Sequence, residues 1–140
     1  VLIANLKSGV DEKEYKDVEF GYVKFVFRVE ATDDTNYISL DKAKEAFAKI
    51  NELRKAQGLK ELTWSDGIYN KLSLPKANQI SRQYDSTGFV ARREEDPATV
   101  AMKWFNSGLR ELLLDPNATE GAVAAVVNGD GYYYWAYNYK

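Results

Sequence analysis

The last twenty residues carry the pattern that most limits the fold of this chain. Two runs of strand-forming residues, 121–127 and 132–139, are separated only by Asn-Gly-Asp-Gly at 128–131. Glycine, asparagine and aspartate tolerate the positive φ angles that a tight loop between antiparallel strands requires. The sequence therefore predicts a C-terminal β-hairpin.

Alternate residues of a strand point to opposite faces, so the aromatic run at 132–139 divides into two rows. The rows are Tyr133, Trp135, Tyr137 and Tyr139 on one face, and Tyr132, Tyr134, Ala136 and Asn138 on the other. One row must lie in the core. The other either packs within the sheet or forms an exposed aromatic face suited to protein or sugar contact, since tyrosine combines a large ring with a polar tip.

Helical patterns occupy the middle of the chain. Between Ser39, a suitable N-cap, and Gly58, a stop signal, apolar residues recur at three- and four-residue spacing, which predicts a helix. A second helical stretch is expected to begin near residues 65–66. It is predicted to break before Pro75, because proline disfavours helical geometry in the residue before it, and to resume to about Tyr84.

Asp96 followed by Pro97 marks the start of a third helix. An aspartate can cap the free N–H groups of the first turn, and a proline at the first helical position loses no hydrogen bond. Val100, Trp104 and then Leu109 are expected to mark the buried side of this helix.

The N-terminal part is organised differently. Residues 20–30 alternate between apolar and polar side chains, which predicts a half-buried strand, and residues 1–19 are expected to form an arm or edge element. The chain thus divides into an N-terminal arm and strand extension, residues 1–38, and a domain at residues 39–140. The order of strand, helical regions and hairpin predicts an α+β domain whose sheet is covered by helices.

The composition excludes most kinds of enzyme site. The chain has no histidine and no cysteine, so it lacks imidazole bases and ligands, thiolate nucleophiles and disulfides. Its 19 basic and 21 acidic residues give a net charge of −2 without a basic run, which argues against nucleic acid or an anionic membrane as partner. No apolar run is long enough for a membrane span.

Three stretches together resemble the CAP superfamily, the cysteine-rich secretory, antigen 5 and pathogenesis-related 1 proteins, whose domain is also called SCP. The first runs from Ile50 to Trp64 and is similar to the pattern N-x-x-R … G-L-x-x-L-x-W of bacterial members. Residues 104–107, Trp-Phe-Asn-Ser, resemble their W-x-x-S helix. The third stretch runs from Leu113 through Gly121 into the hairpin. The resemblance covers about residues 40–140 and implies an α-β-α sandwich, usually secreted.

The resemblance also implies a surface cleft with two histidines and two acidic residues that can hold a divalent metal. In this chain the matching positions hold Gln83 or Tyr84 and Arg110 in place of the histidines, and Glu94 or Glu95 and Ser107 in place of the acidic residues. A guanidinium cannot coordinate a cation, and the imidazole ligands are gone. We therefore expect no metal and no cofactor, and we treat these six residues as candidates for a degenerate binding cleft.

Each candidate has an ordinary structural alternative. Arg110 could bind a carboxylate or phosphate, or it could simply complement a helix dipole. Glu94 and Glu95 could pair with Arg110, or they could belong to a solvated charged run. Ser107 and Tyr84 lack a visible activating base.

The motif order and the lost histidines predict a non-catalytic, bacterial-type binding or interaction module, located outside the cell or at its surface. Its partner would be a protein, a carbohydrate or a small apolar ligand. Two alternatives stay open: a metal-independent hydrolase that uses Glu94 or Glu95, and a carrier of small apolar ligands or lipids. The chain begins at Val1 rather than methionine, so we expect a processed form or an excised domain.

Overall fold

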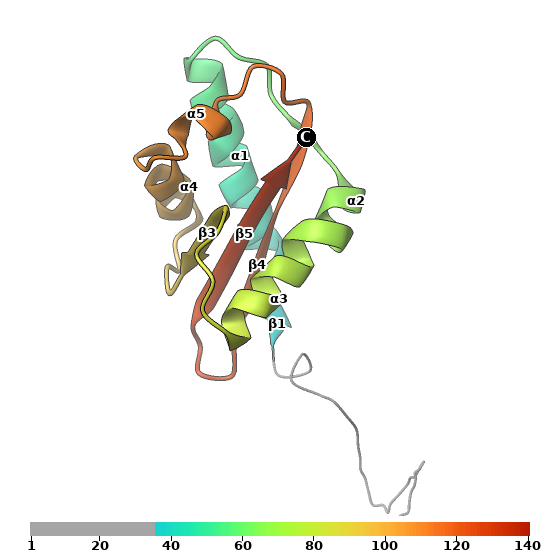
Figure 1. Ribbon diagram of the computed structural model, residues 1–140, viewed down its shortest axis with the longest axis vertical. Helices are drawn as coiled ribbons and strands as arrows, with labels where there is room; N and C mark the ends of the chain where they lie inside the picture. Colours follow the sequence, from blue (N-terminus) through green and yellow to red (C-terminus); the bar gives the residue numbers. More distant parts are fainter. Residues whose placement is uncertain (1–35) are drawn as a thin grey trace, which may run out of the picture. The chain divides into compact units, whose positions relative to one another are not determined.

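Helices cover both faces of a mainly antiparallel sheet in the computed structural model, which describes residues 36–140 (Figure 1). The predicted arm at 1–19 and the predicted strand at 20–30 lie outside the described residues. The α+β class and the α-β-α layering agree with the expectation from the sequence. None of the helices within residues 36–140 has the length and apolarity to cross a membrane.

The predicted C-terminal hairpin is present, and its two strands form the centre of the sheet. The strands within residues 36–140 are β1 (Tyr37–Ile38), β2 (Thr63–Trp64), β3 (Phe89–Arg92), β4 (Glu120–Val127) and β5 (Tyr133–Tyr139). Their order is β1-β4-β5-β3, and β2 pairs with β4 in parallel. The register of the hairpin runs from Gly121 opposite Tyr139 to Val127 opposite Tyr133.

Each face of the sheet has its own layer of helices (Figure 1). One layer holds α1 (Leu40–Ala56), α4 (Pro97–Phe105) and α5 (Arg110–Leu113), and the other holds α2 (Asp66–Ile68), the π-helical turn η2 (Tyr69–Ser73) and α3 (Leu74–Arg82). Trp135 and Tyr137 are buried on the α1 side, whereas Tyr134 and Ala136 are buried under α3. Both predicted rows therefore contribute buried residues, whereas Tyr132 of the second row precedes β5 and is 42% exposed.

The predicted helix starts are in place, although they are stabilised in different ways. The Asp96 carboxylate accepts a hydrogen bond from the Thr99 N–H at 2.9 Å, which caps α4 as expected. Ser39 occupies the N-cap of α1, but its side chain makes no capping bond. Its N–H instead donates to the Ala125 carbonyl at 2.9 Å and ties the start of α1 to the sheet. Gly58 follows the C-cap of α1 with φ +78°.

Three local predictions were wrong. The helical stretch does not break before Pro75, because η2 widens the helix by one residue and the Leu74 N–H bonds to the Tyr69 carbonyl across the π turn. Pro75 then lies in the first turn of α3, where its missing N–H costs little. Helix α3 ends at Arg82, two residues earlier than expected. Helix α4 ends at Phe105, so Leu109 lies in the turn after it.

Candidate functional site

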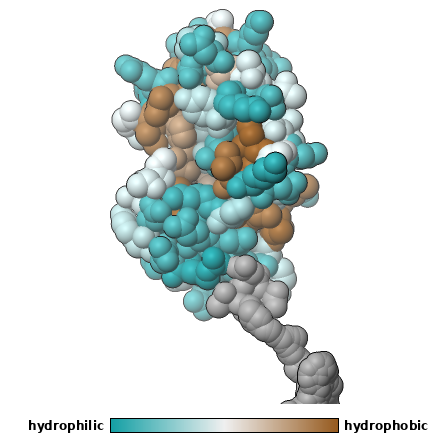
Figure 2. Space-filling model, turned by 45° about the vertical axis from the view of Figure 1, so that its right-hand side comes forward, coloured by the Kyte–Doolittle hydropathy of each residue, from teal (hydrophilic) through white to brown (hydrophobic). Residues whose placement is uncertain are grey.

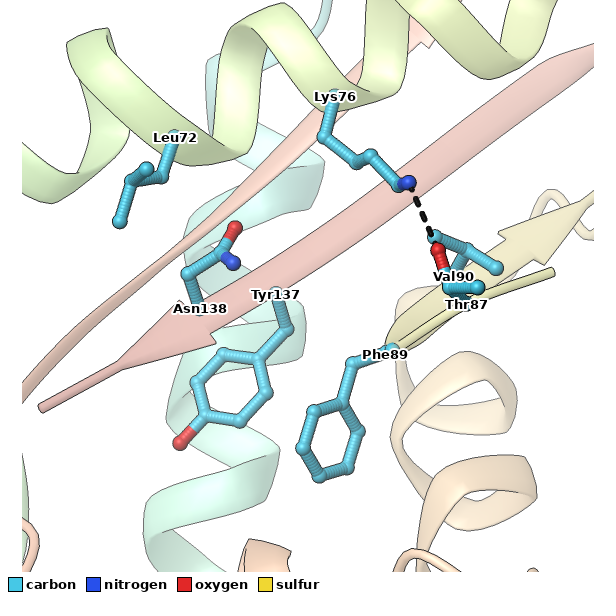
Figure 3. Close-up of a pocket in the computed structure, with 8 residues that line it drawn as sticks. Leu72, Lys76, Thr87, Phe89, Val90, Tyr137 and Asn138 are labelled. Carbon is cyan, nitrogen blue, oxygen red and sulfur yellow. Dashed lines mark hydrogen bonds between the residues drawn. The ribbon is translucent and has the colours of Figure 1, made fainter. Parts of the chain in front are cut away.

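A groove lies between α3, the start of β3 and the end of β5, and we call it the α3–β3 groove (Figure 3). Its cavity volume is about 310 Å³. The residues that line it are Leu72 and Lys76 from the helical side, Thr87 and Gly88 from the loop, Phe89 and Val90 from β3, and Tyr137 and Asn138 from β5. The groove therefore combines apolar side chains with an ammonium, two hydroxyls and an amide.

An ion pair stands at the loop side of the groove. Lys76 Nζ lies 2.7 Å from Asp85 Oδ2 and also donates to Thr87 Oγ1 at 3.1 Å (Figure 3). Asp85 Oδ1 accepts from the Thr87 N–H at 2.9 Å and from the Thr87 hydroxyl at 2.7 Å. Gln79 Nε2 donates to Asp85 Oδ2 at 3.3 Å. The carboxylate is thus held by donors from α3 and from its own turn.

These donors determine the ionisation of Asp85. The Lys76 hydrogen bond, followed by the Thr87 N–H and hydroxyl, holds the pKa of the Asp85 carboxyl well below its ordinary value. A carboxyl with so low a pKa is not a general acid near neutral pH, and a carboxylate already engaged by four donors is a poor base. The Lys76–Asp85 pair orders the loop and places charge beside the groove, but it is not suited to proton transfer.

The other wall of the groove is suited to contact with an apolar group. The apolar side chain of Leu72 is 51% exposed, whereas the next residue, Ser73, is buried. Ser73 Oγ lies 2.9 Å from both Asn138 Oδ1 and the Ala122 carbonyl, which fixes the position of the Asn138 amide. On the face drawn in Figure 2, hydrophilic residues predominate and hydrophobic residues gather in separate patches.

Gln83 and Tyr84 follow the end of α3 and are both exposed. Tyr84 is 79% exposed, and its ring lies under the Arg92 guanidinium at 4.4 Å from the centroid to Cζ. Neither residue lines the α3–β3 groove.

Glu94 and Glu95 lie in the loop between β3 and α4, where both have structural partners. Glu94 Oε2 accepts from the Asp96 N–H at 3.1 Å, and Glu94 Oε1 lies 3.3 Å from Lys103 Nζ. The Asp96 N–H, and more weakly Lys103, lower the pKa of Glu94. Glu95 Oε2 lies 3.9 Å from Lys42 Nζ, and that ammonium also donates to the Glu95 carbonyl.

Ser107 and Arg110 lie beyond the other end of α4. The Ser107 hydroxyl donates to the Trp104 carbonyl at 2.7 Å and accepts from the Leu109 N–H at 3.1 Å, so it shapes the turn after the helix. Arg110 Nε donates to the Phe105 carbonyl at 2.6 Å, and its Cζ lies 4.0 Å from the Phe105 ring centroid. The guanidinium therefore complements the C-terminus of α4.

The six candidates thus occupy three separate places. Glu95 and Ser107 flank the nine residues of α4, which extend over roughly 13 Å. No hydrogen bond or ion pair among the described residues joins Arg110 to either glutamate, because Arg110 is engaged at Phe105 and Asn106. Within residues 36–140, no group of three or more acidic residues could hold a metal ion.

Sequence reasoning did not select Lys76, Asp85 and Thr87. Asp85-Ser86-Thr87 is an ordinary turn sequence, and nothing in the spacing connects it to Lys76, which lies nine positions earlier on α3. The one sequence signal that could have pointed to Asp85 is the Asp-x-Thr turn that follows the helix ending at Arg82.

The residues that carried the resemblance support the backbone. The Asn51 amide donates to the Leu62 carbonyl at 3.1 Å and accepts from the Leu62 N–H at 2.7 Å. Arg54, fully buried, donates to the carbonyls of Lys60, Leu113 and Asp115 at 2.9 to 3.1 Å. These side chains anchor the loop after α1 and the segment that leads into β4.

A family model and a solved structure match this chain. A model of the cysteine-rich secretory protein family, CAP, matches residues 47–139, about two thirds of the chain. Among solved structures, a cysteine-rich secretory protein from Staphylococcus aureus is similar with 22% identity and a TM-score of 0.46. The alignment covers 71% of this chain and 39% of the staphylococcal chain. No curated protein matches this sequence. On the match of the family model, this chain belongs to the CAP family of cysteine-rich secretory proteins.

Proposed function

We propose that this chain is a non-catalytic CAP domain that acts outside the cell or at its surface and binds a small amphipathic ligand in the α3–β3 groove. The observation that carries the proposal is the state of Asp85, whose carboxylate binds Lys76 and Thr87 of the groove lining. Its carboxylate is bound by Lys76, by Gln79 and twice by Thr87. It is a fixed charge that helps to shape a binding surface.

Nothing lining the groove provides the pair of groups that nucleophilic catalysis needs. The lining holds two hydroxyls, on Thr87 and Tyr137, and that of Thr87 donates to the Asp85 carboxylate at 2.7 Å. The Tyr137 hydroxyl is buried and accepts or donates no hydrogen bond among residues 36–140, and burial raises its pKa well above the ordinary value. The only basic side chain there is Lys76, which is paired with the same carboxylate. An activated nucleophile requires a free base within hydrogen-bond reach, and this arrangement provides none.

The hydrolase alternative has less support than the binding reading. Glu94 accepts the Asp96 N–H and pairs with Lys103, which favours its charged form. Glycoside hydrolysis requires one carboxyl group whose pKa is raised so that it can act as an acid. A lowered pKa at Glu94 works against that role.

The dimensions of the groove favour a small ligand. A volume of about 310 Å³ lies at the lower end of the range for small-molecule sites, which is roughly 300 to 1,000 Å³. Leu72 offers an apolar contact, while Lys76 from the same helical side and Asn138 from β5 offer polar groups. A ligand with one apolar face and one hydrogen-bonding edge fits this lining.

Two leucines provide a matched test of the binding site. Leu72 is 51% exposed at the groove, and Leu112 is 49% exposed on α5. A library of small amphipathic compounds should contain members that raise the melting temperature of the wild type and of Leu112→Asn, but not of Leu72→Asn. Compounds that stabilise all three proteins equally would contradict binding in the groove.

Catalysis is tested separately. Ester, glycoside and peptide substrates are offered to the wild type, Asp85→Asn, Glu94→Gln and Glu95→Gln. We expect no turnover that depends on any of these carboxylates. A specific activity that disappears in one variant would establish the hydrolase instead, and lipid retained in a native mass spectrum would favour the carrier.

A further inference from the structure

Arg93 has an unusual backbone conformation at the end of β3. Its φ is +65°, which makes it the only non-glycine residue with a positive φ within residues 36–140. Glycine adopts this left-handed region without strain, whereas a residue with a Cβ does not. The backbone hydrogen bond at this position, from the Arg93 N–H to the Tyr133 carbonyl at 2.6 Å, needs no side chain. The chain therefore retains an arginine where glycine would serve the fold better.

Arg92 and Arg93 are each held over a tyrosine ring. Arg92 Cζ lies 4.4 Å from the ring centroid of Tyr84, and Arg93 Cζ lies 4.5 Å from that of Tyr132. Both rings are exposed, at 79% and 42%. A guanidinium stacked on a ring keeps its N–H groups in the plane of the stack, where they can bind a carboxylate or phosphate in bidentate fashion. The two arginines are thus oriented before any ligand arrives.

Neither guanidinium forms an ion pair with a carboxylate of residues 36–140. The neighbouring carboxylates have other cations: Asp85 pairs with Lys76, Glu94 with Lys103, and Glu95 with Lys42. Arg92 donates instead to the Asp85 backbone carbonyl. In a protein with a net charge of −2, two adjacent arginines without acidic partners are available to an external anion.

We propose that Tyr84, Arg92, Arg93 and Tyr132 form a binding site for an anionic carbohydrate, and we call it the arginine–tyrosine surface. The guanidinium groups bind the acidic substituents of the polymer. The exposed tyrosine rings stack against its sugar rings, as aromatic side chains with a polar tip are suited to do. This surface lies outside the lining of the α3–β3 groove, so it is a site additional to the one proposed above.

The strand edge explains why a carbohydrate fits better than an acidic peptide. An extended peptide binds a sheet by hydrogen bonding along a free edge strand. Although β3 is the last strand of the sheet, the Val90 carbonyl already accepts from Trp104 Nε1 at 3.1 Å. That bond occupies an acceptor that an added strand would need. A ligand of this surface is therefore recognised by side chains alone, through charge and ring stacking.

Binding is tested with polygalacturonate as the anionic probe and dextran as the neutral one. The wild type should bind polygalacturonate, with an affinity that falls as salt is raised, and should not bind dextran. The double variant Arg92→Gln/Arg93→Gln should lose affinity by about tenfold or more. The matched control is Lys60→Gln/Lys71→Gln, which removes the same charge from two exposed lysines elsewhere and should leave affinity unchanged.

Polyglutamate separates carbohydrate recognition from charge alone. Equal affinity for polyglutamate and polygalacturonate would overturn the carbohydrate assignment. The proposal is also overturned if polygalacturonate does not bind, or if the lysine control loses as much affinity as the arginine variant.

Arg93→Gly distinguishes binding from a structural role. Because glycine relieves the positive φ, this variant should melt at the same temperature as the wild type or higher, yet bind polygalacturonate several-fold more weakly. A lower melting temperature with unchanged affinity would show that Arg93 serves the fold and would contradict the proposal. Ligands of the groove should bind this variant normally, so the failure of one site leaves the test of the other intact.

Discussion

The α1 side and the α3–β3 side of the sheet use their polar residues in opposite ways. On the α1 side, Asn51 and Arg54 are buried and bind only the backbone groups of distant loops. On the α3–β3 side, Lys76 and Asp85 pair with each other near solvent, and Arg92 and Arg93 lie over exposed rings. The first arrangement holds the chain together, and the second leaves charge and apolar surface accessible to solvent.

The contrast explains why the family of this chain can be recognised while its binding site cannot be inferred from the family. Asn51 and Arg54, which carried the resemblance in the sequence and lie within the range that the family model matches, fasten loops to the core. The positions where the resemblance implied a cleft contain side chains that cap helices or stack on neighbours. A scaffold can persist while its site changes, because function depends on particular side chains placed on the fold.

The largest effect is expected at Arg54. Replacement by Met leaves the carbonyls of Lys60, Leu113 and Asp115 without their buried donor, which should lower the free energy of unfolding by about 3–5 kcal/mol. Lys55→Met, at an exposed neighbour, serves as the control and should have little effect. Denaturant unfolding measures both. Equal stability of the two variants would contradict the claim that buried polar residues on the α1 side hold the fold together.

Asn51→Ala should have the next largest effect. The substitution removes both hydrogen bonds to Leu62 and leaves its N–H and carbonyl unpaired in the core, at a cost of about 2–3 kcal/mol. Glu52→Ala changes an exposed position on the same helix and should cost much less. If the two variants unfold at the same denaturant concentration, the loop after α1 does not depend on this amide.

Asp85→Asn should have a smaller effect that depends on pH. Because the folded state lowers the pKa of Asp85, its charge adds stability above the ordinary pKa of 3.8, and that stability is lost as the pH falls through the lower folded value. The variant should therefore melt below the wild type at neutral pH, and the gap should narrow below about pH 4. Asp130→Asn, in the hairpin loop, is the control. A constant gap across pH would contradict the assigned role of the charge.

Strong local patterns made most of the fold predictable. The Asn-Gly-Asp-Gly loop gave the hairpin, Asp96 gave the start of α4, and the spacing from Ser39 to Gly58 gave α1. The π-helical turn before Pro75 was missed because hydrogen bonds to a residue five positions earlier leave no periodic signature of their own. The sequence left open whether the second aromatic row is buried, and the helices on both faces bury residues of both rows but not Tyr132.

The site was much less predictable. The resemblance to the family selects candidates by their place in the sequence, as for Gln83, Glu94, Ser107 and Arg110. Place in the sequence alone does not show which groups a side chain contacts. Lys76 and Asp85 meet across a helix end and a turn, a contact that depends on where α3 stops. The arginine–tyrosine surface depends on a backbone angle at Arg93 that a lone sequence does not reveal.

The most direct test of the central claim is a map of backbone amide shifts in ¹H–¹⁵N NMR spectra, recorded while a stabilising amphipathic compound is added. If ligands bind on the α3–β3 side of a structural scaffold, the largest shifts fall at Leu72, Gly88 and Asn138, which line the groove. Shifts concentrated around Asn51 and Arg54, or at Ser107 and Arg110, would contradict that division of roles.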